Sequence, residues 1–227
     1  MLVASEAWKT AYPSAAIGLL AMRGVSNPQD HEGLQQQKRH LEAELRDHYA
    51  GYDRAALKEL PILNAYAEYY RQFKKTYHVQ LQLESVVFQG KPLPTAGALV
   101  EAMFMAELRD HVLTAGHDLE AVEPPVRIEV ARGEEQYVRL NGRGQTLKAG
   151  DMYLADSQGI LSSILYGPDR RTQIRPETGQ VLFTTYAPPG IGSHAVHHHL
   201  ETIRDNVWIV APEATVVSLA VYVARQV

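Results

Sequence analysis

Residues 126–131 read VRIEVA, and the runs QYVRLN (136–141), GILSSILYG (159–167) and QVLFTTYAP (180–188) follow with the same texture. Each run is short, is rich in β-branched and aromatic residues, and is bounded by glycine, proline, aspartate or asparagine. Further runs of this kind are QTLKAGDMYLAD (145–156), VWIVAP (207–212) and ATVVSLAVYVA (214–224). Together they predict the strands of an antiparallel sheet over the second half of the chain.

The first half of the chain is predicted to be mainly helical. Residues 30–49, 63–73 and 96–113 are rich in helix formers and carry apolar residues at helical spacing. Pro61 suits the start of the second helix, because the N–H that proline lacks would have no partner there. The aromatic stripe of this helix is expected to pack in the core; it comprises Tyr66, Tyr69, Tyr70 and Phe73.

Other elements interrupt this order. Strands are expected at 15–22 (AAIGLLAM) and at 80–85 (QLQLES), and a late helix at 194–207 with Ser193 as its N-cap. Helices first and strands second predict an α+β fold, in which N-terminal helices pack on an antiparallel sheet or sandwich.

Length and composition favour one folded domain over residues 1–227, with 1–62 as a helical N-terminal extension containing one strand and 63–227 as the core. The hydrophobic fraction of 45% and charged fraction of 21% are those of a chain that can bury a core. The chain has no cysteine, which excludes disulfides and thiolate metal sites and fits a reducing compartment. We therefore expect a cytoplasmic protein.

Two classes of partner are not expected. No stretch approaches the ~18 apolar residues that a membrane helix requires. The formal net charge of -4 disfavours nonspecific binding of DNA or another polyanion, so any contact with nucleic acid must be local.

Two long segments carry a family pattern. Residues 65–122 combine an aromatic-rich helix, a serine-containing segment, the step Leu93-Pro94, a helix from Leu99, and Asp118-Leu119 after a glycine. Residues 138–188 contain leucine-asparagine-glycine, an aspartate before a glycine strand, a turn, and a threonine before an apolar strand. In this order the segments resemble free-standing B3/B4 proteins, which are similar to the editing domain of the phenylalanyl-tRNA synthetase beta chain.

The resemblance implies a fold of the synthetase B3/B4 type and a proofreading activity in trans. Such a domain binds the aminoacylated 3′ end of a tRNA and hydrolyses the ester of a wrong amino acid, without a cofactor and without synthetase activity. Because the ester is activated, a positioned water and a stabilised oxyanion suffice. The alternative is a noncatalytic binding module for an amino acid or a related small metabolite.

The pocket positions of the family differ in this chain. Ala115 stands near the place of a family histidine, with His117 displaced towards the aspartate, and Thr184 stands where the bacterial synthetase has a glutamate. Phe104 and Glu107 stand where free-standing relatives often carry asparagine and serine. We therefore expect a pocket with a different lining, so specificity for one amino acid does not carry over.

His117 and Asp118 are the candidate catalytic residues. They are expected on a loop after a helix that ends near Gly116. A histidine there can position or deprotonate water near neutral pH. The competing interpretation is that Asp118 caps the next turn and His117 only packs.

Four further residues are candidates for substrate binding. Glu107 lies four residues from both Met103 and His111, so it can line the same cavity and recognise an amino group. Glu84 and Ser85 end the expected strand at 80–85, and Thr184 occupies the position of the family glutamate. The competing interpretations are a solvated charge for Glu107 and an ordinary strand end for Glu84 and Ser85.

Arg170, Arg171 and Arg175 are the candidate RNA-binding residues, because they gather on one expected loop and can contact the phosphates of an acceptor end. Lys74 and Lys75 could contact the same phosphates, but the favoured interpretation of this pair is solvated charges.

The histidines between His194 and His199 include a pair four residues apart, but no third ligand and no HExxH pattern accompany them. No metal site and no cofactor are predicted. The sequence NGRGQ (141–145) predicts a hairpin turn rather than a nucleotide-binding loop.

Overall fold

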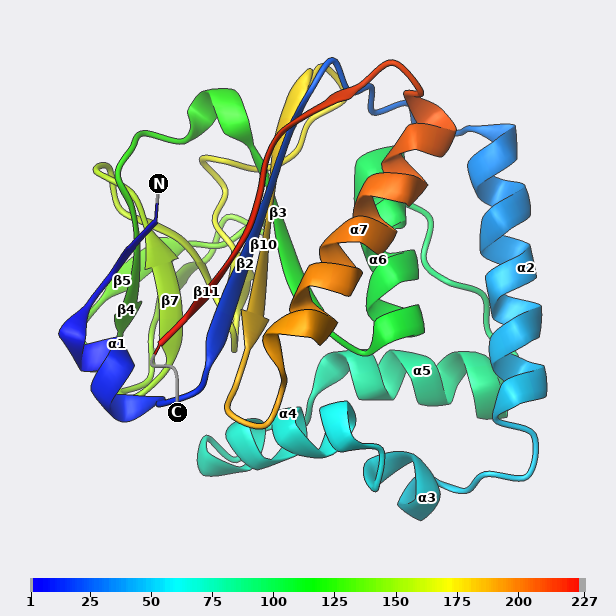
Figure 1. Ribbon diagram of the computed structural model, residues 1–227, viewed down its shortest axis with the longest axis horizontal. Coiled ribbons are helices and arrows are strands. Elements are labelled where there is room, and N and C mark those ends of the chain that lie inside the picture. The colour runs from blue at the N-terminus through cyan, green and yellow to red at the C-terminus, as the bar shows by residue number, and fades with distance from the viewer. Residues whose placement is uncertain (1, 225–227) are drawn as a thin grey trace.

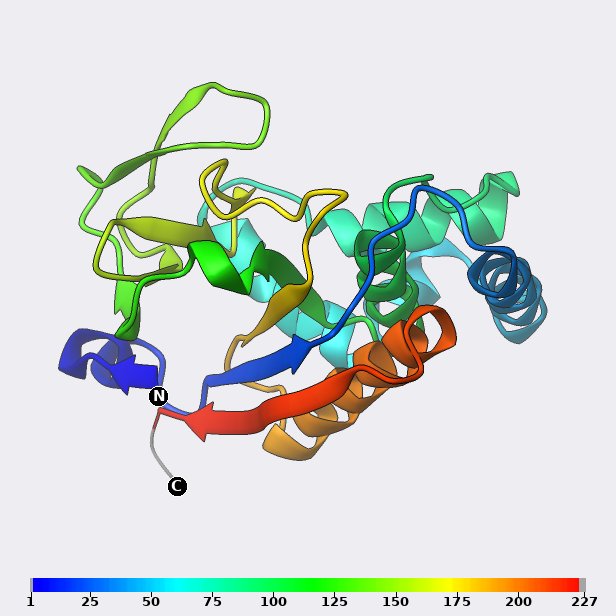
Figure 2. The same cartoon turned by 90° about the horizontal axis from the view of Figure 1, so that it is seen from above.

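The computed structural model describes residues 2–224, whose elements form three layers (Figure 1). A four-stranded sheet lies in the middle, a five-stranded sheet covers one of its faces, and two helices cover the other. Figure 2 shows the same arrangement from above. The predicted α+β fold is confirmed.

The middle sheet is antiparallel throughout. Its order is β11 (Thr215–Val223), β2 (Ala16–Arg23), β10 (Gln180–Ala187) and β3 (Leu113–Asp118). β2 contains the strand predicted at 15–22, and β10 the strand predicted at 180–188. β3 forms one edge of the sheet, so one side of its main chain has no strand partner within the described residues.

The second sheet has the order β1 (Leu2–Ala4), β4 (Val126–Val130), β7 (Met152–Ala155), β8 (Ile160–Ser163) and β9 (Gly167–Pro168). β5 (Gln136–Val138) and β6 (Gly144–Thr146) form the predicted hairpin around NGRGQ. The first 62 residues contribute two strands rather than the one expected, because β1 is too short to stand out in the sequence. It is parallel to β4.

Helices α6 (Ala98–Asp110) and α7 (Ser193–Val210) pack on the middle sheet (Figure 1). The remaining helical segments are α1 (Glu6–Ala11), α2 (Glu32–His48), α3 (Arg54–Lys58), α4 (Pro61–Gln72), α5 (His78–Gln89) and the 3-10 turn η1 (Leu119–Ala121). Within residues 2–224, no helix has both the length and the hydropathy that crossing a membrane requires.

The tyrosines of α4 tie this helix to both sheets. Tyr66, Tyr69 and Tyr70 are buried, as predicted for the aromatic stripe. The Tyr66 hydroxyl donates to the Tyr186 carbonyl in β10, and the Tyr70 hydroxyl donates to the Ile164 carbonyl after β8 at 2.6 Å. Because the phenols of Tyr66 and Tyr70 donate to main-chain carbonyls in β10 and just after β8, α4 links the ends of both sheets.

The strand expected at 80–85 is wrong, since these residues belong to helix α5. QLQLES alternates as a strand would, but Val79, Leu83 and Val86 recur at helical spacing and are buried. Leu81 is 50% exposed. Burial of one helical face outweighs the local alternation.

The loop expected around Gly116 and His117 is also wrong. Helix α6 ends at Asp110, and His111 takes a left-handed conformation with φ 61° that turns the chain back. The following residues form β3, whose six residues are all buried. A sheet position beside β10 is available only in the tertiary fold.

The late helix is longer than expected and is capped differently. Residues 207–210 were expected in a strand but form the last turn of α7, because Val207 continues the buried face that includes Leu200 and Ile203. Gly192, rather than Ser193, occupies the N-cap position and makes no side-chain cap.

Candidate functional site

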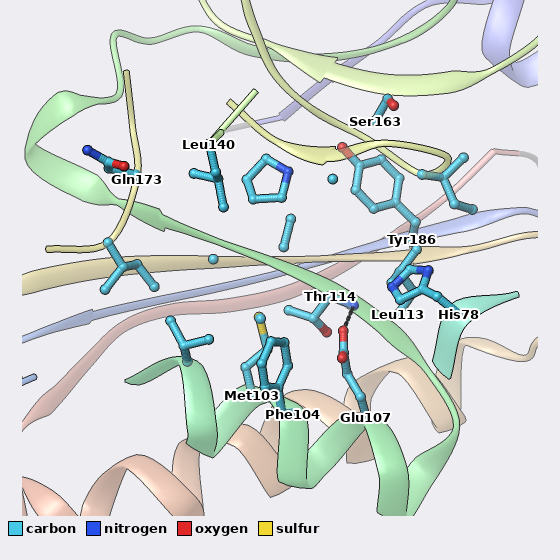
Figure 3. A pocket seen from close by; sticks show the side chains of 17 residues that line it. His78, Met103, Phe104, Glu107, Leu113, Thr114, Leu140, Ser163, Gln173 and Tyr186 are labelled. Atoms are coloured by element: carbon cyan, nitrogen blue, oxygen red, sulfur yellow. Dashed lines mark hydrogen bonds between the residues drawn. The ribbon is translucent and has the colours of Figure 1, made fainter. Parts of the chain in front are cut away.

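A cavity of about 260 Å³ lies beyond the free edge of β3, between that strand, helix α6 and the segment that follows β8 (Figure 3). Its walls are mainly apolar, with Met103 and Phe104 from α6, Leu140 after β5, Ile174, and the ring of Tyr186 from β10. This volume is just below the ~300–1,000 Å³ range of ligand pockets. It suits a group of amino-acid size better than a whole nucleotide.

Glu107 supplies a carboxyl group to this cavity. The side chain comes from α6, where it is 2% exposed, and its Oε1 accepts a hydrogen bond of 2.8 Å from the Thr114 N–H (Figure 3). Burial raises the pKa of Glu107 to about 8, and the hydrogen bond from Thr114 partly opposes that rise. No ion pair joins Glu107 to any cation among the described residues. A buried carboxyl without a counter-charge favours a cationic ligand.

His78 lies at the mouth of the same cavity. It is the first residue of α5, and together with Glu107 it also lines a neighbouring hollow. Its Nδ1 lies 3.4 Å from the Tyr70 hydroxyl. Part of the side chain is exposed, yet the surrounding protein desolvates the imidazole and lowers its pKa below 6.5. Sequence reasoning missed His78, because nothing local distinguishes a histidine that only tertiary packing brings to Glu107.

The free edge of β3 contributes main-chain N–H and C=O groups to the cavity wall. In an antiparallel pair, successive residues direct N–H and C=O alternately towards and away from the partner strand. Thr114 and Asp118 direct their N–H groups away from β10, to Glu107 and to the Thr172 carbonyl. By this alternation, Gly116 also directs its N–H and C=O away from β10, at the cavity wall.

The absence of a side chain at Gly116 also shapes the wall of the cavity. A Cβ placed on this glycine would lie 2.7 Å from Cδ1 of Ile174. The missing side chain therefore lets Ile174 pack directly over the strand. Sequence reasoning had noted Gly116 only as a helix end.

His117 and Asp118 do not line the cavity. The His117 ring is fully buried, with Nδ1 2.8 Å from Thr172 Oγ1 and Nε2 3.2 Å from Ser162 Oγ. Burial lowers the pKa of His117 to about 3, so the ring is neutral and has no open nitrogen. Asp118 caps η1 by accepting from the Glu120 N–H at 3.1 Å. Both residues fit the competing interpretation, in which Asp118 caps the next turn and His117 only packs.

The other predicted substrate-binding residues are dispersed. Ser85 lines the neighbouring hollow together with His78 and Glu107. Glu84 accepts from Gln80 and forms an ion pair with Arg54 at 3.0 Å. Thr184 is buried in β10, where its hydroxyl donates to the Ala115 carbonyl at 3.3 Å. The structure therefore brings together Glu107 and Ser85 but not Glu84 or Thr184.

Two of the three predicted RNA-binding arginines are engaged with carboxylates. Arg171 Nη2 lies 2.9 Å from both carboxylate oxygens of Asp156, and Arg175 Nη2 lies 3.5 Å from Asp118 Oδ2. Arg170 is exposed. Phosphate binding by Arg171 or Arg175 would have to displace these partners.

Three of the histidines at the start of α7 lie beside carboxylates: His197 beside Glu201, and His198 and His199 beside Asp110. His199 is buried between Thr114 Oγ1 at 2.7 Å and Asp110 Oδ2 at 2.9 Å, and His197 faces Glu201. Among residues 2–224, no three side chains of the metal-ligating types gather in a way that could hold a metal ion.

Comparison with known proteins finds similarity to solved structures but not to sequences. No family model matches the chain, and no curated protein matches it. Among solved structures, it is similar to an N-terminal fragment of the phenylalanyl-tRNA synthetase beta-subunit from Pyrococcus horikoshii, with a TM-score of 0.48 and 12% identity over 97% of this chain. The chain covers 50% of that fragment. Membership of the B3/B4 family therefore stays a prediction.

Proposed function

We propose that the cavity binds the amino-acid part of an aminoacyl ester, and that the chain hydrolyses misacylated aminoacyl-tRNA in trans. The observation that carries the proposal is the Glu107 carboxyl, which is buried without a cation at the wall of an apolar cavity. An amino acid esterified through its carboxyl group carries a cationic α-ammonium group, and one whose side chain is apolar or weakly polar matches both features.

Glu107 is the anchor for the α-ammonium group. The Thr114 N–H orients one carboxyl oxygen and leaves the other for the ligand. In the empty cavity the carboxyl is protonated at neutral pH, because its pKa is about 8. A bound ammonium favours the ionised form, so binding releases a proton from Glu107. The apolar side chain of the ligand packs against Met103 and Phe104.

The ester group lies along the edge of β3 in this proposal. The Gly116 N–H donates to the carbonyl oxygen, and it stabilises the oxyanion that forms when water attacks the carbonyl carbon. His78 takes a proton from the attacking water. The bond between the acyl carbon and the ribose oxygen then breaks, and the proton passes to that oxygen. The products are the free amino acid and the ribose hydroxyl.

The second candidate function is noncatalytic binding of a free amino acid or a related metabolite. Two observations about the histidines favour it, because they leave no buried general base in the cavity. His78 lies at the exposed mouth, and the buried His117 has both ring nitrogens occupied. Binding through Glu107 would then occur without turnover.

A panel of mischarged tRNAs separates the two candidates. Ester cleavage above background that falls in Glu107→Gln and His78→Gln supports hydrolysis. Free amino acids that raise the melting temperature of the wild type but not of Glu107→Gln, without cleavage of any ester, support the binding module. Cleavage that is unchanged in both variants would exclude this cavity as the site.

A further inference from the structure

Another hollow, of about 460 Å³, adjoins the cavity. It is distinct from the hollow that Ser85 lines, and its side chains differ in chemistry from those of the cavity. His78 and Gly167 line both, so the two spaces meet at these residues. The rest of its lining includes the cations Lys75 and Arg139 and the ring of Tyr166, together with Tyr70, Thr76, Leu81 and Leu165. A ligand seated in the cavity can therefore extend into it.

Lys75 is held in place at this hollow. Its Nζ lies 4.5 Å from the centroid of the Tyr166 ring, which is the geometry of a cation–π contact. Partial burial lowers the pKa of Lys75, and the charges of Lys148 and Arg139 lower it further. Three cations thus share one region.

No acidic side chain forms an ion pair with this group within residues 2–224, although the nearby Asp151 partly opposes the lowering of the Lys75 pKa. Within residues 2–224, neither Lys75, Arg139 nor Lys148 forms an ion pair, and the Lys148 ammonium donates to the Phe73 carbonyl at 2.6 Å. Arg171 and Arg175, in contrast, are paired with carboxylates. In a chain of net charge -4, a group of cations that form no ion pairs beside a cavity favours an anionic ligand at that place.

We infer that this hollow binds the phosphate groups of the terminal nucleotides of a single-stranded RNA 3′ end, with Lys75 and Arg139 as the contacting cations. The inference rests on the proposed function, since it takes the RNA to be the carrier of the ester in the cavity. The 3′ ribose then lies at the junction beside His78, where the ester enters the cavity. Arg139 contributes a planar donor set and Lys75 a point charge, and both suit phosphate oxygens.

The test compares the full chain with Lys75→Gln/Arg139→Gln and with the matched control Lys74→Gln, which removes a neighbouring exposed cation outside the hollow. Three probes are used: a short single-stranded RNA with a free 3′ hydroxyl, the same RNA esterified with an amino acid, and an amino-acid methyl ester without phosphate. The double variant should bind both RNAs about tenfold more weakly, and its slope of log K against log salt should fall by about 1.4, for two phosphate contacts. The methyl ester should bind equally to all three proteins.

Equal RNA binding by the double variant and the wild type would overturn the inference, whatever happens in the cavity. The proposed function has a separate readout. If the methyl ester fails to bind any of the proteins while the free RNA still requires Lys75 and Arg139, the phosphate site stands and the amino-acid site is wrong.

Discussion

The main chain of Thr114 donates a hydrogen bond of 2.8 Å to the carboxyl of Glu107. The Glu107 side chain of α6 is thereby held against the free edge of β3. This places a carboxyl group and a row of main-chain groups on one cavity wall. The carboxyl is costly for the fold, because burial opposes its ionisation. A costly group is expected where a ligand uses it.

Glu107→Gln should stabilise the protein at alkaline pH while abolishing ligand binding. The pKa of Glu107 is raised from 4.5 to about 8, so the folded state holds a proton that the unfolded chain has lost. The stability from this group is complete below pH ~4.5 and is lost as pH rises to 8. Urea unfolding should show the wild type losing roughly 2–4 kcal/mol relative to Glu107→Gln between pH 5 and 9. Glu68→Gln, at an exposed carboxyl, should show no such difference.

His78→Gln should lower kcat by about 100-fold or more and leave KM nearly unchanged, because a general base acts in the chemical step. The pKa of His78 is lowered below 6.5, so the neutral base is present throughout the neutral range. The kcat of the wild type should rise with pH to a midpoint below 6.5 and level off. His197→Gln serves as the control. An identical loss in that control, or an unchanged kcat in His78→Gln, would remove His78 from the mechanism.

Gly116→Ala should narrow the cavity and weaken binding. The new methyl group would meet Cδ1 of Ile174 at 2.7 Å, so the Ile174 side chain must move into the cavity. Because that atom is the end of a flexible side chain, the free energy of unfolding should fall by only about 1–3 kcal/mol. Gly116→Ala/Ile174→Ala removes the clash and should recover affinity. If the double variant binds no better than Gly116→Ala, the effect comes from the strand itself.

Asp151→Asn should remove a pH dependence of stability. Asp151 is buried, its Oδ1 accepts from the Tyr69 hydroxyl at 2.9 Å, and its Oδ2 has no hydrogen bond partner. Burial raises its pKa from 3.8 to about 7, so its contribution to stability is present below pH ~4 and is lost by pH ~7. Over that range the wild type should lose on the order of 2–4 kcal/mol relative to the variant. If the difference in unfolding free energy between the wild type and Asp151→Asn did not change with pH, that result would contradict the burial of this carboxyl.

The site could be predicted only in part. The sequence predicts that Glu107 lines one cavity with Met103, because spacing along a helix places residues four apart on one face, which is a local rule. His117 was selected on its chemistry alone, and the structure places it in a closed hydrogen-bond network. His78 and the edge of β3 had no signal, since their role depends on elements far apart in the chain.

Sequence patterns alone predict the α+β class, the central strand β2, the hairpin at NGRGQ and the buried aromatic face of α4. These follow from periodicity and turn chemistry, which act over a few residues. Three outcomes depend on the tertiary structure: QLQLES is helical, Gly116 lies in an edge strand, and His78 lines the same cavity as Glu107. Those outcomes depend on which surfaces are buried and on which strand lies beside β10, and contacts between distant segments set both.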